Sequence, residues 1–119
     1  MGRNTRKLEY AHIPDSGDIV WMNFDNGQGH EQKGRRPALI LTSKSFNLLT
    51  GFALICPMTS KLKEYVFHVP VKINDLRGSI MIDQIKSVSW RERNIKFYQK
   101  LDPIIFDEIK GKIIAMIDY

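Results

Sequence analysis

The chain has 119 residues, of which 43% are hydrophobic and 26% are charged. This length and composition indicate one globular domain, exclude a disordered chain and leave no room for separate catalytic and regulatory domains. The formal net charge of +5 favours an anionic partner such as nucleic acid, although proteins that bind no polyanion often carry a similar excess.

The N-terminal residues 1–13 are expected to form a flexible basic arm before a single domain over 14–119. The arm lacks the apolar stretch of a secretory signal, and no apolar run approaches the roughly 18 residues that a membrane-spanning helix needs. Cys56 is the only cysteine and lies in the apolar run 52–56, which favours burial as a small hydrophobe over a reactive thiol. We therefore expect a cytoplasmic protein without a disulfide and without membrane contact.

The first half of the chain predicts three strands. Residues 18–24 are rich in branched and aromatic side chains and follow the strand-breaking cluster 14–17. The short apolar runs 37–42 and 51–58 are typical of strands that are covered on both faces. The segment 43–50 between them is long enough for one helical turn.

The next segments predict further strands around a turn. Residues 64–73 alternate between apolar and polar, but Pro70 cannot donate a hydrogen bond to a neighbouring strand, so this strand should lie at a sheet edge or be bulged. Residues 74–78 are expected to form a turn, followed by one or two strands in 79–88 and a short strand in 96–99.

The chain closes with a predicted helix. Asp102 is a good N-cap, and Pro103 is favoured at the first helical position. Apolar residues then recur at helical spacing and predict a buried stripe; they are Phe106, Ile109, Ile113, Met116 and Ile117. The whole pattern indicates a mainly β protein, a small barrel-like sheet closed by a C-terminal helix.

The segment Gly29–Pro37 packs an imidazole, a carboxylate, an amide and three cations into nine residues. A turn needs Gly, Asn or Pro for its backbone angles, but it does not need this set of groups. We therefore interpret the segment as part of a site rather than as a spacer.

Cleavage of RNA is one reaction that this set of groups suits. The ribose 2′-hydroxyl is a built-in nucleophile, so the protein must accept its proton, protonate the leaving oxygen and stabilise charge on phosphorus. A guanidinium such as that of Arg36 suits the last task. His30 or Glu31 would accept the proton, and the hydroxyl of Thr59 would bind the phosphate. No metal is expected, because the three histidines lie far apart in the sequence.

Structural roles for the same residues remain open at this stage. Arg36 stands before Pro37 at a strand entrance, where it would also serve as an exposed cation or as the partner of Glu31 in an ion pair. Histidine on a loop, as at His30, is more often solvated than catalytic, and Thr59 follows Pro57-Met58, where a turn would explain it.

Taken together, six short motifs point to one family. In chain order they are Gly17-Asp18-Ile19-Val20-Trp21, Phe24-Asp25, Gly29-His30-Glu31-Gln32, Arg36-Pro37-Ala38, Pro57-Met58-Thr59-Ser60 and Asp83-Gln84. Their order and spacing closely resemble the MazF/PemK family of toxin endoribonucleases over roughly residues 14–118. The combination of Gly-x-Glu-Gln with a following Arg-Pro is much more specific than either part.

The resemblance implies an SH3-like β-barrel with short helices that assembles as a homodimer. It also implies metal-independent cleavage of single-stranded RNA at short sequence motifs, with no cofactor, leaving a 2′,3′-cyclic phosphate and a 5′-hydroxyl. A cognate antitoxin, expected to be acidic and partly disordered, would hold the toxin inactive. Arg36 matches the family's catalytic arginine, Thr59 its catalytic threonine, and Glu31 a glutamate implicated in activity in some members.

The chain departs from one version of the family mechanism. A subset of members uses a histidine, an aspartate and a second arginine two positions before that aspartate. His30 and Asp83 match this set, but Met81 stands where the arginine would be. We therefore expect Arg36 and Thr59 to stabilise the transition state, with Arg36 also a candidate proton donor and His30 or Glu31 the base.

The same segments are expected to bind RNA through bases and phosphates. The predicted contacts are Trp21, Asn23, Gln28, Gln32, Lys33, Lys61, Lys63, Asp83, Gln84 and Lys86. Trp90 and Phe97 are either further stacking platforms or parts of the core.

Two other functions compete with RNA cleavage. The CcdB gyrase poisons resemble this family in architecture, but act through a C-terminal Trp-Gly-Ile, whereas this chain ends Ala115-Met116-Ile117-Asp118-Tyr119. A degenerate member that only binds RNA or an antitoxin is the other alternative, and the presence of both Arg36 and Thr59 argues against it.

Overall fold

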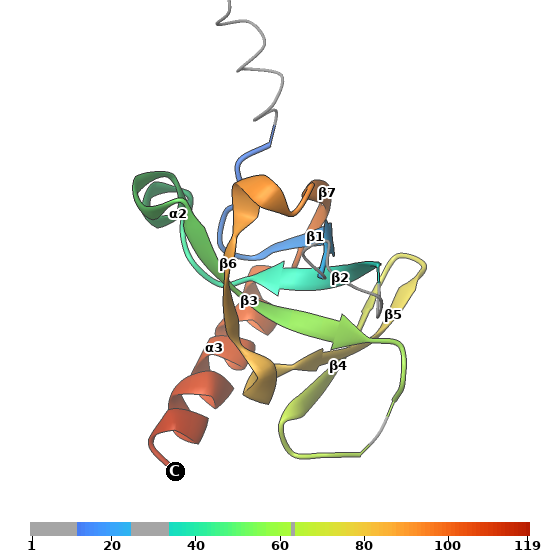
Figure 1. Ribbon diagram of the computed structural model, residues 1–119. Helices are drawn as coiled ribbons and strands as arrows, with labels where there is room; N and C mark the ends of the chain where they lie inside the picture. Colours follow the sequence, from blue (N-terminus) through green and yellow to red (C-terminus); the bar gives the residue numbers. More distant parts are fainter. Residues whose placement is uncertain (1–11, 25–33, 63) are drawn as a thin grey trace, which may run out of the picture.

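The computed structural model describes residues 12–24, 34–62 and 64–119. The strands are β1 (Asp18–Asn23), β2 (Arg35–Ile40), β3 (Phe52–Thr59), β4 (His68–Ile73), β5 (Leu76–Met81), β6 (Lys86–Ser89) and β7 (Lys96–Lys100). The helices are α2 (Lys44–Thr50) and α3 (Pro103–Ile117), and two 3₁₀ turns, η1 (Ile82–Gln84) and η2 (Trp90–Glu92), flank β6 (Figure 1).

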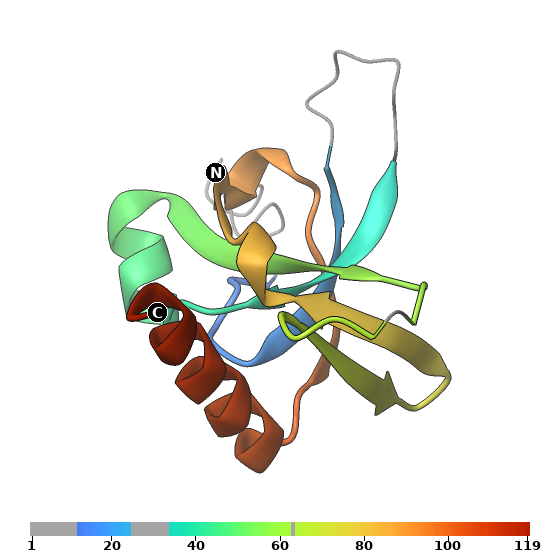
Figure 2. The same ribbon diagram turned by 90° about the horizontal axis from the view of Figure 1, so that it is seen from below.

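The strands form one curled antiparallel sheet with the order β4-β5-β3-β2-β1-β7, to which β6 adds by pairing with β3. The sheet is a half-barrel, and α3 lies along one side of it (Figure 2). Side chains bring the two ends of the sheet together, because Tyr98 donates to the Ile73 carbonyl at 3.3 Å and Asn74 to Gln99 at 2.6 Å. The expected mainly β architecture with a C-terminal helix is confirmed.

Both faces of the central strands are buried over residues 38–40 and 55–58, as the continuous apolar runs predict, but Phe52 and Leu54 at the start of β3 are exposed. Alternate residues of a strand point to opposite faces. Ile19 and Leu39 face the larger core cluster, which includes Phe106 and Ile109 of α3. Their neighbours on the other face, such as Val20, belong to a second cluster that Trp90 closes. The two clusters hold the sheet between two apolar layers.

Two predicted boundaries were wrong. The strand expected from residue 64 begins only at His68, because the His68 N–H donates to the Tyr65 carbonyl at 3.0 Å and closes a turn there. The turn expected over 74–78 is shorter, because Asn74, with φ of 55°, reverses the chain at once and β5 begins at Leu76. Pro70 does lie on an edge strand, as predicted.

Each helix begins after a residue whose side chain caps its N-terminus. Asp102 caps α3 by accepting from the Ile104 N–H at 2.9 Å, and Ser43 caps α2 by accepting from the Phe46 N–H at 3.2 Å. The stripe on α3 is buried as far as Ile113, but Ile117 is 71% exposed because the last turn runs past the sheet (Figure 1).

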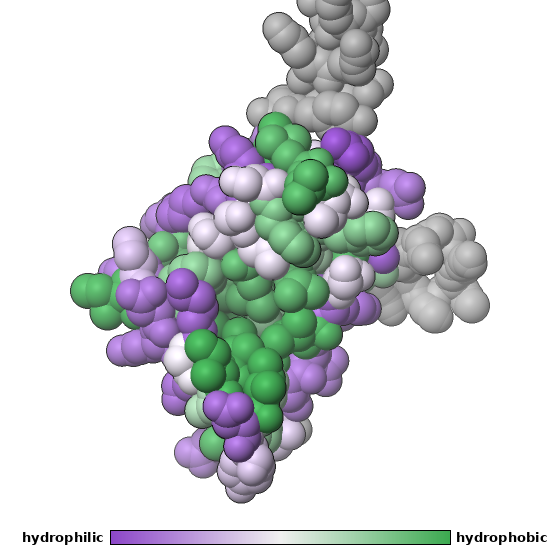
Figure 3. All heavy atoms as spheres, turned by 90° about the vertical axis from the view of Figure 1, so that its left-hand side faces the viewer, coloured by the Kyte–Doolittle hydropathy of each residue, from purple (hydrophilic) through white to green (hydrophobic). Residues whose placement is uncertain are grey.

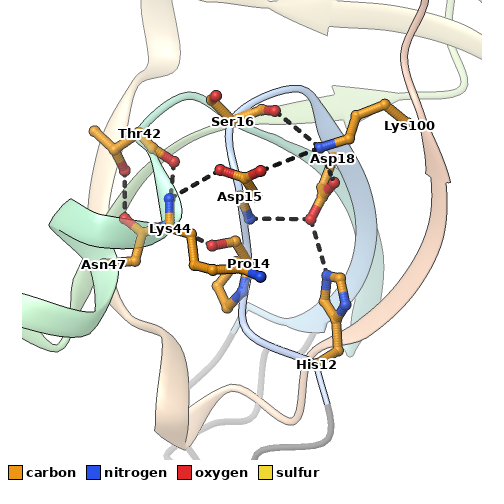
Figure 4. Close-up of polar contacts among 9 residues, drawn as sticks. All are labelled: His12, Pro14, Asp15, Ser16, Asp18, Thr42, Lys44, Asn47 and Lys100. Carbon is orange, nitrogen blue, oxygen red and sulfur yellow. Dashed lines mark hydrogen bonds and ion pairs between the residues drawn. The ribbon is translucent and has the colours of Figure 1, made fainter.

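A buried carboxylate ties the start of the domain to its far strand (Figure 4). Asp18 is 1% exposed and accepts from His12 Nε2 at 2.8 Å and from the Asp15 N–H at 3.0 Å. Its other oxygen lies 2.7 Å from Lys100 Nζ on β7. Burial alone would lower the pKa of Lys100, but Asp18 and then Asp15 raise it overall.

Asp15 connects the same network to α2. It accepts from the Lys44 N–H at 2.9 Å, and this hydrogen bond is the main reason why the pKa of Asp15 is lowered. A carboxyl group whose pKa is lower in the folded than in the unfolded state stabilises the fold at pH values above its unfolded-state pKa. This contribution is lost as the pH falls through the folded-state pKa.

We expect Asp18→Asn to lower the free energy of unfolding by about 2 kcal/mol, because it leaves Lys100 without its closest anion and removes charge-assisted hydrogen bonds. Urea titration followed by circular dichroism measures this change. Asp107→Asn is the matched control: its carboxylate is exposed and lies 3.9 Å from Lys110, so the loss should stay below about 0.5 kcal/mol. Equal losses in the two variants would contradict the role assigned to Asp18.

Candidate functional site

The register of three strands brings Arg36 and Thr59 toward each other. β1 pairs with β2 through Met22 and Arg36, and β2 pairs with β3 through Ala38 and Pro57. Continuing the second register by two residues places Arg36 across from Thr59, the last residue of β3. Two residues that are far apart in sequence thus lie at the same end of neighbouring strands.

Both residues line one cleft with a volume of about 430 Å³. Its lining residues are Trp21, Arg36, Pro37, Met58, Thr59, Ser60, Lys61, Leu76 and Arg77. Within the part of the chain that the structure describes, this lining contains three cations, the hydroxyls of Thr59 and Ser60, and no carboxylate. Such a cleft attracts anions from solution.

Phe24 supports the guanidinium of Arg36. The Arg36 Cζ atom lies 5.4 Å from the centroid of the Phe24 ring, and Lys86 Nζ lies 5.8 Å from the same centroid. A cation over an aromatic face is attracted by the ring quadrupole. Within the described residues no carboxylate forms an ion pair with Arg36, and the ion pair with Glu31 considered above lies outside them.

The backbone of β5 fixes the position of Thr59. Thr59 pairs with Ser79, and a Cβ atom on the neighbouring Gly78 would overlap the Thr59 carbonyl oxygen. Thr59 Oγ1 also accepts from the Lys61 N–H at 3.2 Å. A glycine is therefore required at residue 78 for β5 to pack this closely against the end of β3.

Asn23 anchors the end of β1 through hydrogen bonds. Its N–H donates to the Arg93 carbonyl at 2.8 Å, and Arg93 Nη1 donates to the carbonyls of Asn23 at 3.3 Å and Phe24 at 2.8 Å. The Asn23 side chain accepts from Arg35 Nη1 at 3.0 Å. Among the predicted RNA contacts, Trp21 and Lys61 line the cleft, whereas Asn23 does not.

Three other predicted contacts also lie outside the lining of the cleft. Asp83 and Gln84 form part of η1, where Asp83 accepts from the Tyr65 hydroxyl at 3.2 Å and thereby raises the pKa of Tyr65. Lys86 is on β6, beside the Phe24 ring that also contacts Arg36. Lys86 is therefore close to the site, while Asp83 and Gln84 are not among the residues that line the cleft.

Several predicted residues lie outside the described part of the chain. They are Gln28, His30, Glu31, Gln32, Lys33 and Lys63. The segment 25–33 connects β1 to β2, whose ends contribute Trp21 and Arg36 to the cleft. The assignment of the proton acceptor to His30 or Glu31 therefore stays a prediction.

The structure also separates the two aromatic alternatives. Trp90 is 3% exposed and donates from Nε1 to the Asn47 carbonyl at 2.9 Å, so it belongs to the core. Phe97 is 41% exposed, and its ring centroid lies 4.8 Å from that of His12. Neither residue lines the cleft.

Leu76 and Arg77 are cleft residues that the sequence did not predict. Both were expected in a turn, but the structure places them at the start of β5. The only signal in the sequence was Asn74, which can reverse the chain within two residues and so begin the next strand early.

The thiol and the possible metal ligands of the described residues form no second reactive site. Cys56 is buried, and burial, followed by the charge of Asp83, raises the pKa of its thiol to about 12. Among the described residues no group of three or more His, Cys, Asp or Glu side chains is placed to hold a metal ion. In the same part of the chain, no helix has both the length and the apolar character to cross a membrane.

Comparison with known proteins gives a consistent result. Residues 15–117 match the family described as PemK-like, MazF-like toxin of type II toxin-antitoxin system. The endoribonuclease toxin MazF of Escherichia coli K12 is 37% identical over 106 residues, which cover 89% of this chain and 96% of that protein. The endoribonuclease PemK of Escherichia coli is 28% identical over 108 residues, 87% of this chain and 81% of that protein.

Solved structures show the same similarity. A crystal structure of MazF from Deinococcus radiodurans superposes with a TM-score of 0.79 at 35% identity, covering 91% of this chain and 99% of that chain. A MazE-MazF crystal structure from the same organism gives a TM-score of 0.81 at 32% identity, covering 90% and 98%.

We expect Gly78→Ala to lower the free energy of unfolding by about 1–3 kcal/mol, because the added methyl group forces β5 away from the Thr59 carbonyl. Thermal and urea unfolding measure this change. Gly111→Ala is the control: nothing lies within 4 Å of a Cβ there, so the better helix propensity of alanine should raise stability by up to about 1 kcal/mol. A Gly78→Ala protein as stable as wild type would contradict the close packing of β5 on Thr59.

Proposed function

The chain belongs to the PemK-like, MazF-like toxin family of type II toxin-antitoxin systems, and on this premise we propose that it is an endoribonuclease toxin. Its substrate is single-stranded RNA, cut at short sequence motifs. The observation that carries the proposal is the shared cleft of Arg36 and Thr59, whose described lining residues present cations and hydroxyls.

The proposed reaction is an attack by the ribose on its own neighbouring phosphate. The 2′-oxygen forms a bond to phosphorus as its proton passes to a base, for which His30 and Glu31 are the candidates. The bond from phosphorus to the 5′-oxygen breaks, and that oxygen takes up a proton. The products are a 2′,3′-cyclic phosphate and a 5′-hydroxyl, and the reaction needs no metal because the substrate supplies the nucleophile.

Arg36 and Thr59 stabilise the charge that develops on the phosphoryl oxygens. The guanidinium presents several donors to these oxygens in a planar fork. The threonine hydroxyl donates one further hydrogen bond from the fixed end of β3. Donors held in place before the reaction stabilise a transition state without reorganisation.

The other cleft residues suit a single strand. Trp21 is half-buried at the wall of the cleft, where a splayed base can stack on it, and Lys61 can neutralise a phosphate. Lys86, beside the Phe24 ring, can do the same next to Arg36.

We propose that a cognate antitoxin inhibits the enzyme by covering this cleft. The MazE-MazF structures from Deinococcus radiodurans support the existence of such a partner. An acidic, partly disordered peptide fits a cleft that Arg36, Lys61 and Arg77 line, and it would order as it binds.

We also propose that the protein acts as a homodimer in the cytoplasm. Apolar side chains gather on the face that carries α2 and α3, the left-hand side of Figure 1 (Figure 3). The exposed apolar residues of α2, of the start of β3 and of the end of α3 are Phe46, Leu48, Leu49, Phe52, Leu54, Ile114 and Ile117. An apolar surface of this kind favours association with another protein surface.

We expect the purified protein to cut a long single-stranded RNA in EDTA and to leave fragments that end in cyclic phosphate. Arg36→Ala should lower the cleavage rate by about 100- to 1,000-fold, because it removes donors to the developing charge, and Thr59→Val should lower it in the same direction. Gel analysis of end-labelled RNA measures the rates, and circular dichroism checks the fold.

Lys44→Gln is the control for that assay. It also removes a cation, but from α2, which lies on the other side of the molecule from the β4–β5 hairpin (Figure 1). That hairpin contributes Leu76 and Arg77 to the cleft. Cleavage that survives in Arg36→Ala would remove the central assignment. RNA left intact by a protein that inhibits gyrase would favour the gyrase-poison alternative, and RNA bound but uncut would favour a degenerate member.

We expect the double variant Ile114→Glu with Ile117→Glu to be monomeric where the wild type is dimeric, because charged side chains would be buried without partners in the interface. Light scattering coupled to size-exclusion chromatography gives the mass. Ile104→Glu is the control, a residue 70% exposed at the opposite end of the same helix. A double variant that stays dimeric would place the interface elsewhere.

A further inference from the structure

Arg77 lines a second hollow beside the cleft that holds Arg36 and Thr59. This hollow has a volume of about 260 Å³, and its lining residues are Leu62, Pro70, Val71, Lys72 and Arg77. Arg77 is the residue that lines both spaces. The two hollows therefore lie side by side, with a guanidinium-bearing residue between them.

Two cations face each other across the β4–β5 hairpin. The register of the two strands pairs Lys72 directly with Arg77, and both side chains are exposed. Like charges in directly opposed residues of an antiparallel pair are destabilising. Within the described residues no carboxylate forms an ion pair with either of them. An anion bound between them would relieve the repulsion.

The backbone holds this pair close to the proposed site of cleavage. Gly78 follows Arg77 and packs against the carbonyl of Thr59, so Arg77 starts from a position fixed relative to the end of β3. The rest of the hollow is apolar: Leu62 is 60% exposed, and Pro70 and Val71 belong to β4. Two cations beside an apolar surface suit a nucleotide unit, with its phosphate on the cations and its base on the apolar side chains.

We propose that the hollow lined by Arg77 and Lys72 is a second RNA subsite, which binds a phosphodiester of the same strand next to the one that is cut. The inference rests on the proposed function, since it takes the strand in the first cleft to be RNA. In this proposal the RNA strand leaves Arg36 and Thr59, passes Arg77 and continues over Lys72 at the edge of the sheet. Arg77 is a binding residue in this proposal, and the chemistry remains with the first cleft.

Salt dependence of binding tests the subsite without relying on cleavage. The probe is a fluorescently labelled 2′-O-methyl RNA, whose blocked 2′-oxygen cannot attack, and anisotropy gives its Kd at several salt concentrations. For single strands the slope of log K against log salt changes by about 0.7 for each phosphate that the protein neutralises. The double variant Arg77→Gln with Lys72→Gln loses the contact with one phosphate and should therefore show a slope shallower by about 0.7.

The matched control is the double variant Lys44→Gln with Lys112→Gln, which loses the same charge on α2 and α3. Its slope should equal that of the wild type. Arg77→Glu separates binding from folding, because it places opposite charges across the hairpin and should keep or raise the thermal unfolding midpoint while weakening binding beyond Arg77→Gln. Equal slopes for both double variants, or wild-type affinity in Arg77→Glu, would overturn the subsite.

Cleavage of unmodified RNA by the wild type, measured in the same buffer, distinguishes the two proposals. Cleavage with an unchanged slope in Arg77→Gln with Lys72→Gln overturns the subsite alone. A shallower slope without any cleavage by the wild type overturns the endoribonuclease proposal and leaves an RNA-binding hollow. Failure of the wild type to bind the 2′-O-methyl RNA overturns the subsite.

Discussion

The pairing of β3 on both of its edges is the constraint on which the architecture depends. β2 occupies one edge, while β6 and β5 follow each other along the other edge with η1 between them. Pro57, which has no N–H, lies between the last residue paired with β6 and the first paired with β5. The change of partner therefore leaves no N–H of Pro57 unpaired. Beyond it, Thr59 pairs with β5 and lies at the same end of the sheet as Arg36.

Charged side chains are distributed unevenly over the sheet. Asp15 and Asp18 are engaged by Lys100, His12 and backbone N–H groups at the start of the domain, where they serve the fold. At the other end of the central strands, the charged side chains among the described residues that line the cleft are cations. The carboxylates of the Asp18 network are thus used for stability, and the cleft cations are available to an anionic substrate, which is the property that both proposals use.

The positions of the two tryptophans bear on the alternatives to RNA cleavage. Trp90 is part of the core, and Trp21 lines the cleft. Neither lies on α3. Arg36 and Thr59, by contrast, line one space, which is the arrangement that the proposed cleavage requires. The geometry therefore supports RNA cleavage over both alternatives.

The sequence by itself determined the local features and the family. The apolar runs of β1 and β3 and the Asp102 cap of α3 depend on neighbours in the chain, and the order of short motifs identified the relatives. Only the tertiary structure decided that Arg77 faces Lys72 beside the cleft, that Trp90 closes a core, and that Asn23 is held by Arg93. The reason is physical: these contacts join segments far apart in the chain, and strand register, which no local pattern encodes, determines which side chains meet.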